Sequence, residues 1–339
     1  MFVVTYRKIF FALSGAFILL AVAAMVFYGF NFGIDFLGGT LTQVQYTGVA
    51  ATSTVNVVPA NAAGPLVAVQ RVATSSTVAT TAPTRPSVAV LQSAINNLHF
   101  SNFSDTEIQP SGSASYIIRS RQLSNTEKTE FLKALSLDGK APYTLQQYDS
   151  VGPVIGAELI QKSYIALSIV IICIVLFITF AFRKVSEPVP SWKYGLATII
   201  ALVHDVVIPT GLFIIYLHFT GGQLDILFVS AILTILGYSV HDTIVVFDRV
   251  RERLRVNKEQ RVKEVFETTV GKSVRETFGR SINTSFTIFL VLLVLFLIGG
   301  STTRNFALML LIGIIVGTYS SIFVASPLLV VFEKWQKKD

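Results

Sequence analysis

The chain has 339 residues, of which 52% are hydrophobic and only 14% charged, and its mean hydropathy is +0.62. Soluble domains carry about 25% charged residues, so this composition indicates a membrane protein that crosses the bilayer several times. The net charge of +7 does not indicate nucleic-acid binding, because residues 31–162 hold equal numbers of basic and acidic residues. The excess lies in short segments beside apolar runs, where it reports topology. The single cysteine, Cys173, excludes a disulfide framework and a cysteine metal site.

The first apolar run extends from Ile9 to Phe30 and follows Arg7 and Lys8. A run of about 20 residues is long enough to cross a bilayer. A cleaved signal peptide is the alternative, since residues 21–24 are small, but the run continues past them. We predict an uncleaved helix within residues 1–30, with the N-terminus in the cytoplasm.

Residues 31–162 form a hydrophilic segment that we predict to be an extracytoplasmic α+β domain. Gly33, Gly38 and Gly39 interrupt an alternating pattern at its start, which we interpret as a strand. Residues 49–86, rich in Ala, Thr, Ser and Val, are typical of a flexible insertion. Further elements are predicted as a helix at 87–98, strands at 105–109, 115–121 and 143–149, and a helix whose capping box joins Ser124 to Glu127.

Five more membrane spans are predicted, and with the first they make a helical polytopic membrane protein of six spans. The connections 183–193 and 248–281 are rich in Lys and Arg, whereas the turns 219–223 and 300–304 contain only Arg304. This bias places both termini in the cytoplasm. The predicted five-helix bundle, 163–339, has spans at about 163–182, 194–218, 224–247, 282–299 and 305–332.

The basic connection 248–281 also contains an amphipathic pattern. Val262, Val265, Phe266, Thr269 and Val270 repeat at helical spacing. We predict a helix lying at the cytoplasmic membrane interface, with a solvated connector as the alternative.

Polar residues inside the predicted spans gather on three helices. An Asp at the bilayer centre costs about 2.5–3.5 kcal/mol, so these helices should face one another. Because both lie in the inner half of the membrane, Arg280 is the expected counter-charge of Asp242, and a carboxylate whose pairing can break and re-form is typical of a proton pathway. Histidine titrates near neutral pH and adds a second proton-binding group. The alternative is a purely structural hydrogen-bond network. The candidate relay residues are Asp242, Arg280 and His241, and the supporting polar residues are His204, Asp205, Tyr238, Ser239, Thr243 and Asn283.

Other patterns carry less chemistry. Gly313 and Gly317 form a GxxxG followed by Ser320 and Ser321, which predicts close helix packing. Residues 271–273 imitate the end of a P-loop, but position 266 is Phe where a Gly is required. No metal site, cofactor site or catalytic triad is indicated, so we predict a transport component rather than an enzyme.

Three stretches, FGIDFLGGTLTQVQY, VGPVIGAEL and GYSVHDTIVVFDRVRE, together resemble the SecF family of protein-export membrane proteins, and ALVHDVVIPTG also fits. The resemblance covers almost the whole chain and implies membership of the RND superfamily, with a ferredoxin-like external domain. It implies a SecD-like six-span partner, the SecYEG channel, indirect cooperation with SecA, and preproteins as cargo. The insertion at 49–86 departs from the family pattern. Residue by residue, Asp242 is the Asp of the GYSxxDT motif, Arg280 is the Arg before the fifth span, and Gly33, Asp35, Gly38 and Gly39 belong to the first stretch.

The resemblance gives an expected mechanism in the cell membrane. Protonation of Asp242 breaks its pairing with Arg280, the helices rearrange, and the external domain holds or pulls the emerging polypeptide. Coupling to Na+ instead of H+ stays open. The alternatives are a small-molecule RND efflux pump, which usually has twelve spans, and a scaffold that transports nothing.

Overall fold

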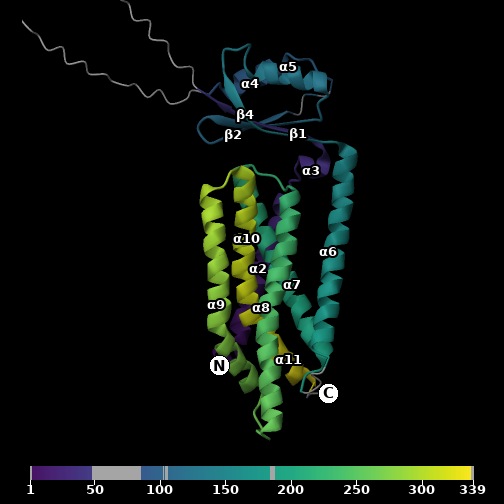
Figure 1. The fold of residues 1–339 in the computed structure, drawn as a ribbon, viewed down its shortest axis with the longest axis vertical. Coiled ribbons are helices and arrows are strands. Elements are labelled where there is room, and N and C mark those ends of the chain that lie inside the picture. The colour runs from purple at the N-terminus through teal and green to yellow at the C-terminus, as the bar shows by residue number, and fades with distance from the viewer. Residues whose placement is uncertain (1, 48–84, 102, 104–105, 184–187, 337–339) are drawn as a thin grey trace, which may run out of the picture. The chain divides into compact units, whose positions relative to one another are not determined.

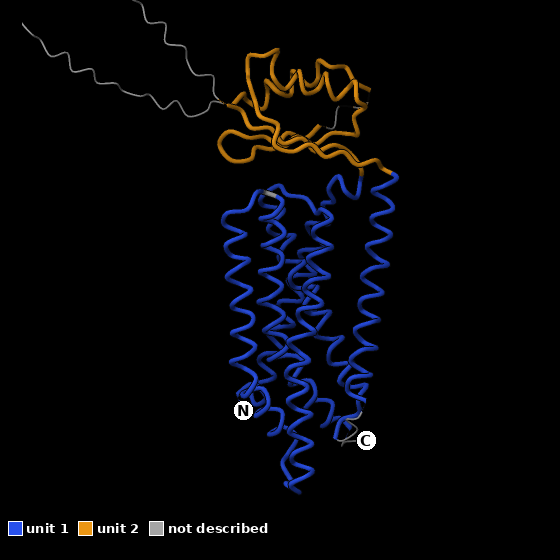
Figure 2. Tube along the Cα trace, viewed as in Figure 1, with its two compact units in different colours: residues 1–37, 154–339 blue, residues 38–153 orange. Residues whose placement is uncertain are grey.

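The computed structural model describes residues 2–47, 85–101, 103, 106–183 and 188–336. All of the insertion expected at 49–86 except its last two residues lies outside this range. The chain forms two compact units (Figure 2), one of residues 38–153 and one that combines residues 1–37 with 154–339.

The unit of residues 38–153 is a βαββαβ domain, confirming the expected ferredoxin-like α+β fold. All strand pairs are antiparallel, and the strand order is β2-β3-β1-β4. Helices α4 and α5 cover the same face of the sheet (Figure 1). The elements are β1 (Gly39–Tyr46), α4 (Val88–Asn96), β2 (Glu107–Ser111), β3 (Ser115–Ser120), α5 (Asn125–Leu135) and β4 (Tyr143–Val151).

The core of this domain lies between the sheet and its two helices. Val44 and Ile118 of the sheet and Leu91 and Phe131 of the helices are fully buried. The predicted capping box is present, because the Ser124 hydroxyl accepts from the Glu127 amide and the Glu127 carboxylate accepts from the Ser124 amide. Tyr46 donates a 2.9 Å hydrogen bond to the Leu135 carbonyl, and burial raises the pKa of its phenol.

The first strand is shorter than predicted. Residues 34–37 form a helical turn, α3 (Ile34–Leu37), and the strand begins only at Gly39. Gly38 and Gly39 have φ values of 78° and 139°, so the chain changes direction between the two elements. A Cβ at position 38 would lie 2.8 Å from the Pro153 Cα, which leaves room only for glycine.

Among its described residues, the other unit contains six helices long and apolar enough to cross a membrane, as predicted. The helices α7, α8 and the last span are the most buried, and α6 is the most exposed, with only Gly156 and Ile178 enclosed. The spans are α2 (Arg7–Tyr28), α6 (Pro153–Ala181), α7 (Ser191–Thr220), α8 (Ile226–Glu259), α9 (Phe266–Ile298), and a last span made of α10 (Ser301–Ser320), a π-helical turn η1 (Ser321–Ala325) and α11 (Ser326–Gln336).

Two predicted boundaries differ from the structure. Helix α6 begins at Pro153, so the expected domain end at residue 162 falls inside this helix. The amphipathic segment is not a separate helix, because the helix begins at Phe266 and continues as α9. Phe266 and Val270 are buried within the protein, whereas Val262 and Val265 are exposed and precede the helix. The apolar residues at its start therefore pack against the bundle.

Small residues allow the helices to approach closely. A Cβ added to Gly211 of α7 would overlap Ala21 of α2, and one added to Gly313 of α10 would overlap Ile235 of α8. At Gly317 the nearest atom would be the Ser239 Cβ at 3.3 Å. The GxxxG face therefore packs against α8, as predicted.

Candidate functional site

Asp205 of α7 has hydrogen-bond partners for both carboxylate oxygens. Its Oδ1 lies 2.8 Å from His204 Nδ1. Its Oδ2 accepts hydrogen bonds from Ser239 of α8 and from Ser320 of α10, the latter at 2.6 Å. All four side chains are buried. Because a buried carboxylate must be hydrogen-bonded, this group ties three helices together.

Asp242, one turn along α8 from this group, is much less well bonded. It is buried beside the hydroxyls of Ser281 and Ser321, and His241 and Asp205 interact with it electrostatically. Its Oδ2 nevertheless accepts no hydrogen bond from the described residues, and the Ser281 hydroxyl is also unsatisfied there. Such a carboxylate has an acceptor position free for a proton or a new donor.

The structure does not contain the predicted pair of Asp242 and Arg280. None of the ion pairs between described residues joins these two side chains, and Arg280 is exposed on α9. His241 and Asn283 are also exposed. His241 is one position from Asp242 and Asn283 is two positions from Ser281, so each lies on a different face of its helix from its buried neighbour.

These residues belong to two exposed polar stripes, which we call the open stripes. One follows α8 and the other α9, each at the three- and four-residue spacing of a single helix face. Polar side chains within membrane helices normally face protein or a water-filled cavity. The open stripes comprise Ser230, Thr234, Gly237 and His241 on α8, and Arg280, Asn283, Thr284 and Thr287 on α9.

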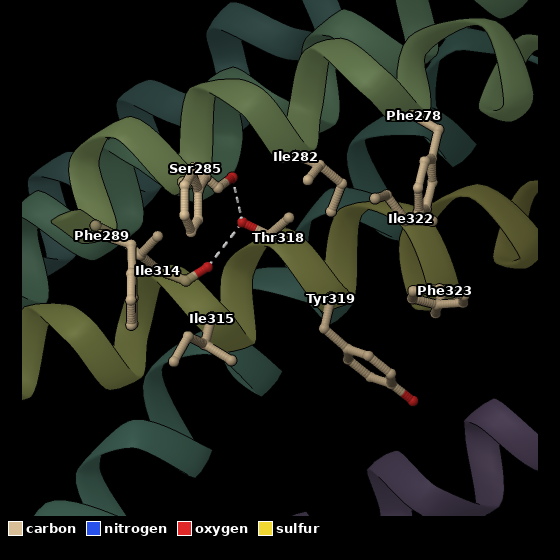
Figure 3. A pocket seen from close by; sticks show the side chains of 11 residues that line it. Phe278, Ile282, Ser285, Phe289, Ile314, Ile315, Thr318, Tyr319, Ile322 and Phe323 are labelled. Carbon is tan, nitrogen blue, oxygen red and sulfur yellow. Dashed lines mark hydrogen bonds between the residues drawn. The ribbon is translucent and has the colours of Figure 1, made fainter.

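A row of hydroxyls joins α8, α9 and α10. Tyr238 lies 2.7 Å from the Ser285 hydroxyl, which lies 2.6 Å from the Thr318 hydroxyl. Thr318 donates in turn to the Ile314 carbonyl (Figure 3). The row borders an apolar pocket of ≈ 350 Å³ between α9 and the last span, from which Tyr319 extends toward α2 (Figure 3).

The last predicted polar residue, Thr243, contacts the π-helical turn. Its hydroxyl lies 2.8 Å from that of Ser321, the first residue of η1. Single π-helical turns occur frequently at functional sites. Here the turn lies beside Asp242.

The residues of the FGIDFLGG stretch are not among the buried polar residues around Asp205 and Asp242. Gly33 and Asp35 contact the connection between α7 and α8, where the Asp35 carboxylate accepts from the Ile226 amide at 2.9 Å. Gly38 and Gly39 shape the start of β1. The candidate site residues therefore fall into four places: the buried polar residues around Asp205 and Asp242, the open stripes, the N-terminus of α8 and the start of β1.

Sequence reasoning missed three contributions. Ser320 and Ser321 were interpreted as packing residues, but they bond Asp205 and Thr243. The contact of Asp35 with α8 was not foreseen. The only available signal was a hydroxyl-rich stretch in an otherwise apolar span.

Within the described residues, no group of three or more His, Cys, Asp or Glu could hold a metal ion.

Comparison with known proteins identifies the family. The family model "Protein export membrane protein SecD/SecF, C-terminal" matches residues 133–335, and the "SecD/SecF GG Motif" model matches residues 23–48. The chain belongs to the SecD/SecF family of protein-export membrane proteins. It is similar to the protein translocase subunit SecF of Thermobaculum terrenum, with 37% identity over 99% of this chain and 94% of that protein. For SecF of Anaerolinea thermophila, identity is 32%, with 98% and 94% covered.

A solved structure agrees with this assignment. SecDF of Thermus thermophilus, described as a translocon-associated membrane protein, superposes with a TM-score of 0.72 at 28% identity. The match covers 98% of this chain and 38% of that longer chain. The chain is thus a SecF-type accessory subunit of the SecDF protein translocase, a multi-pass membrane component of transport.

Proposed function

We propose that this subunit, together with a SecD-like six-span partner, uses the proton-motive force to complete export of unfolded preproteins through SecYEG after SecA-driven translocation. Asp242 accepts and releases the proton, and Arg280 and His241 serve the relay. The family places the chain in a translocase, and its polar cluster supplies a group suited to binding a proton.

The observation that carries the proposal is the incomplete bonding of Asp242. Its Oδ2 is buried without a hydrogen-bond donor from the described residues, whereas Asp205 nearby is fully bonded. A buried carboxylate without a donor is costly when ionised, so protonation or a new cation relieves that cost. The Asp242 side chain is therefore the group whose charge can change during a transport cycle.

The open stripes support a partner in the membrane. Arg280 and His241 are exposed on helices long enough to span a bilayer, and lipid is a poor environment for a cation. We propose that the SecD-like partner covers the open stripes and that Arg280 meets Asp242, or a carboxylate of the partner, in another state of the cycle.

The charge pattern supports the orientation. Ten of the 27 Lys and Arg residues lie between 248 and 281, and others begin α2, as Arg7 and Lys8 do, or follow α11. Basic connections remain in the cytoplasm, so we propose a cell-membrane location with both termini cytoplasmic and the α+β domain outside.

The test replaces Asp242 with Asn in the assembled translocase in inverted membrane vesicles. Export driven by ATP alone should be unchanged, and the additional export that a proton gradient supports should disappear. The matched control is Asp248→Asn on the same helix, because Asp248 is exposed and pairs only with Arg251 among the described ion pairs. Full gradient-dependent export by Asp242→Asn would leave the scaffold role as the better account.

A further inference from the structure

Residues 31–37, which connect α2 to β1, are joined to the connection between α7 and α8. The Gly33 amide donates to the Leu224 carbonyl at 2.7 Å, and the Leu224 amide donates to the Asn31 carbonyl at 2.8 Å. Phe32 and Leu224 thereby form a parallel bridge. Asn31 adds a side-chain hydrogen bond to the Gly222 carbonyl. We call this pairing of residues 31–37 with 222–226 the clamp.

Asp35 fastens the clamp to the first turn of α8. Its Oδ2 accepts from the Ile226 amide at 2.9 Å, while Asp225 accepts from the Phe228 amide at 3.0 Å as the helix's own N-cap. Free amides and the helix dipole both favour carboxylates at this position. Burial, and next the nearby Asp35 carboxylate, raise the pKa of Asp225. The two carboxylates are thus close together, and α8 is capped from two separate segments.

The residues around Asp35 also favour this arrangement. A Cβ at Gly33 would lie 3.0 Å from the Leu224 carbonyl oxygen, so glycine permits the short hydrogen bond there. Phe32 and Phe36 pack edge to face with ring centroids 5.5 Å apart, and Phe36 and Leu224 are buried. The contact is therefore a packed junction with several independent bonds.

We propose that the clamp transmits movement of α8 to the α+β domain, and that Asp35 is a positioning residue for transport. This inference rests on the proposed function, and it adds that α8 moves when Asp242 changes its protonation. Only three residues separate Asp35 from Gly39, the first residue of β1. A displacement of the α8 N-terminus is therefore passed along the chain into the domain through the hydrogen bond to Ile226.

The experiment measures distances between spin labels in the full chain assembled with its SecD-like partner, with Cys173 replaced by Ser. Labels at Trp192 and Lys258, both exposed, report on the membrane bundle, and labels at Trp192 and Glu130 report on the domain relative to the bundle. Both distances are recorded at pH 8 and pH 5.5, together with gradient-driven export.

In the unmodified chain, both distances should shift with pH. With Asp35→Ala the bundle distance should still shift, the domain shift should be lost, and gradient-driven export should fall about tenfold, a typical coupling effect. Asp35→Asn keeps an oxygen acceptor for the Ile226 amide and should restore both. Gly33→Ala should act like Asp35→Ala, whereas Gly15→Ala, where a Cβ meets nothing within 4 Å, should have no effect.

A domain shift that persists in Asp35→Ala would overturn the clamp while leaving the proposed function intact. If neither distance shifts in the unmodified chain and Asp242→Asn exports normally, the proposed function fails and the clamp fails with it. An Asp35→Asn variant as impaired as Asp35→Ala would also contradict the role of this hydrogen bond.

Discussion

Asp205 and Asp242 lie in neighbouring helices, each directly after a histidine, yet their surroundings differ in kind. Asp205 has donors for both oxygens, from His204 and from serines of α8 and α10. Asp242 has an oxygen without a donor from the described residues, and its neighbour His241 is exposed. Similar dipeptides thus have different surroundings: Asp205 is hydrogen-bonded to side chains of three helices, whereas Asp242 has an acceptor position free.

The largest expected effect on stability distinguishes the two aspartates. Asp205→Ala leaves the Ser239 hydroxyl and His204 Nδ1 without their acceptor, while Ser320 keeps its hydrogen bond to the Gly317 carbonyl, and it should lower the free energy of unfolding by about 2 kcal/mol. Asp242→Ala removes fewer bonds and should cost clearly less. Thermal unfolding of the purified chain in mild detergent provides the comparison. Equal losses of stability in the two variants would contradict the difference in hydrogen bonding between Asp205 and Asp242.

The next largest expected effect is on gradient-driven export and concerns Arg280, the cation on the open stripe of α9. Arg280→Gln should reduce gradient-driven export by about tenfold, because it removes about 1.4 kcal/mol of charge-assisted hydrogen bonding in the transport cycle. Arg275→Gln provides the matched control, since Arg275 is also exposed on α9 but lies nearer its N-terminus. The same reduction in both variants would point to surface charge rather than to the relay.

A smaller difference in stability is expected between a substitution that meets the packed face of α8 and one that lies on its open stripe. Gly313→Ala forces a Cβ onto Ile235 and should destabilise the chain by about 1 kcal/mol through overpacking. Gly237→Ala, on the open stripe, meets nothing within 4 Å and should be neutral or stabilising, because alanine favours helix. Thermal unfolding of both variants measures the difference. Destabilisation by Gly237→Ala would mean that the open stripe is already packed in the isolated subunit.

The smallest expected effect is on thermal stability and concerns a hydrogen-bonded carboxylate outside the membrane-spanning helices. Hydrogen bonds, first from Arg121 and then from the Ser124 amide, lower the pKa of Glu127 from 4.5 to about 2. Its ionised form therefore stabilises the domain above pH 4.5, and this contribution is lost as the pH falls toward 2. The difference in thermal stability between the unmodified chain and Glu127→Gln should shrink from pH 7 to pH 3. Glu130→Gln, an exposed neighbour on α5, should show no such dependence.

Much of the fold was predictable because it follows from local patterns. The six spans correspond to six apolar runs, and the capping box at Ser124 and Glu127 correctly marks the start of α5. The strand expected through Ile34–Leu37 was wrong, because that segment turns into a helix where Phe36 is buried. Its conformation depends on contacts with the distant residues 222–226, which no local pattern records.

The residues of the candidate site could be predicted from the sequence, but their hydrogen-bond partners could not. Charged and polar residues inside apolar runs are conspicuous, so Asp205 and Asp242 could be selected from composition alone. Which of them is paired depends on how α7, α8, α9 and α10 are rotated about their axes. That rotation places Ser320 against Asp205 and leaves Arg280 exposed, and it follows from packing across the whole bundle.

The π-helical turn at Ser321–Ala325 gives the last span a property that a regular helix lacks. A π turn contains one residue more than an α turn, and each residue of an α-helix advances by about 100°. Moving the extra residue along the helix would therefore rotate the intervening side chains about the helix axis without unwinding either end. Ser320, which bonds Asp205, and Ser321, which meets Thr243, lie at the N-terminal edge of this turn. Side chains of the last span next to Asp242 can thus rotate about the helix axis without a translation of one helix past another.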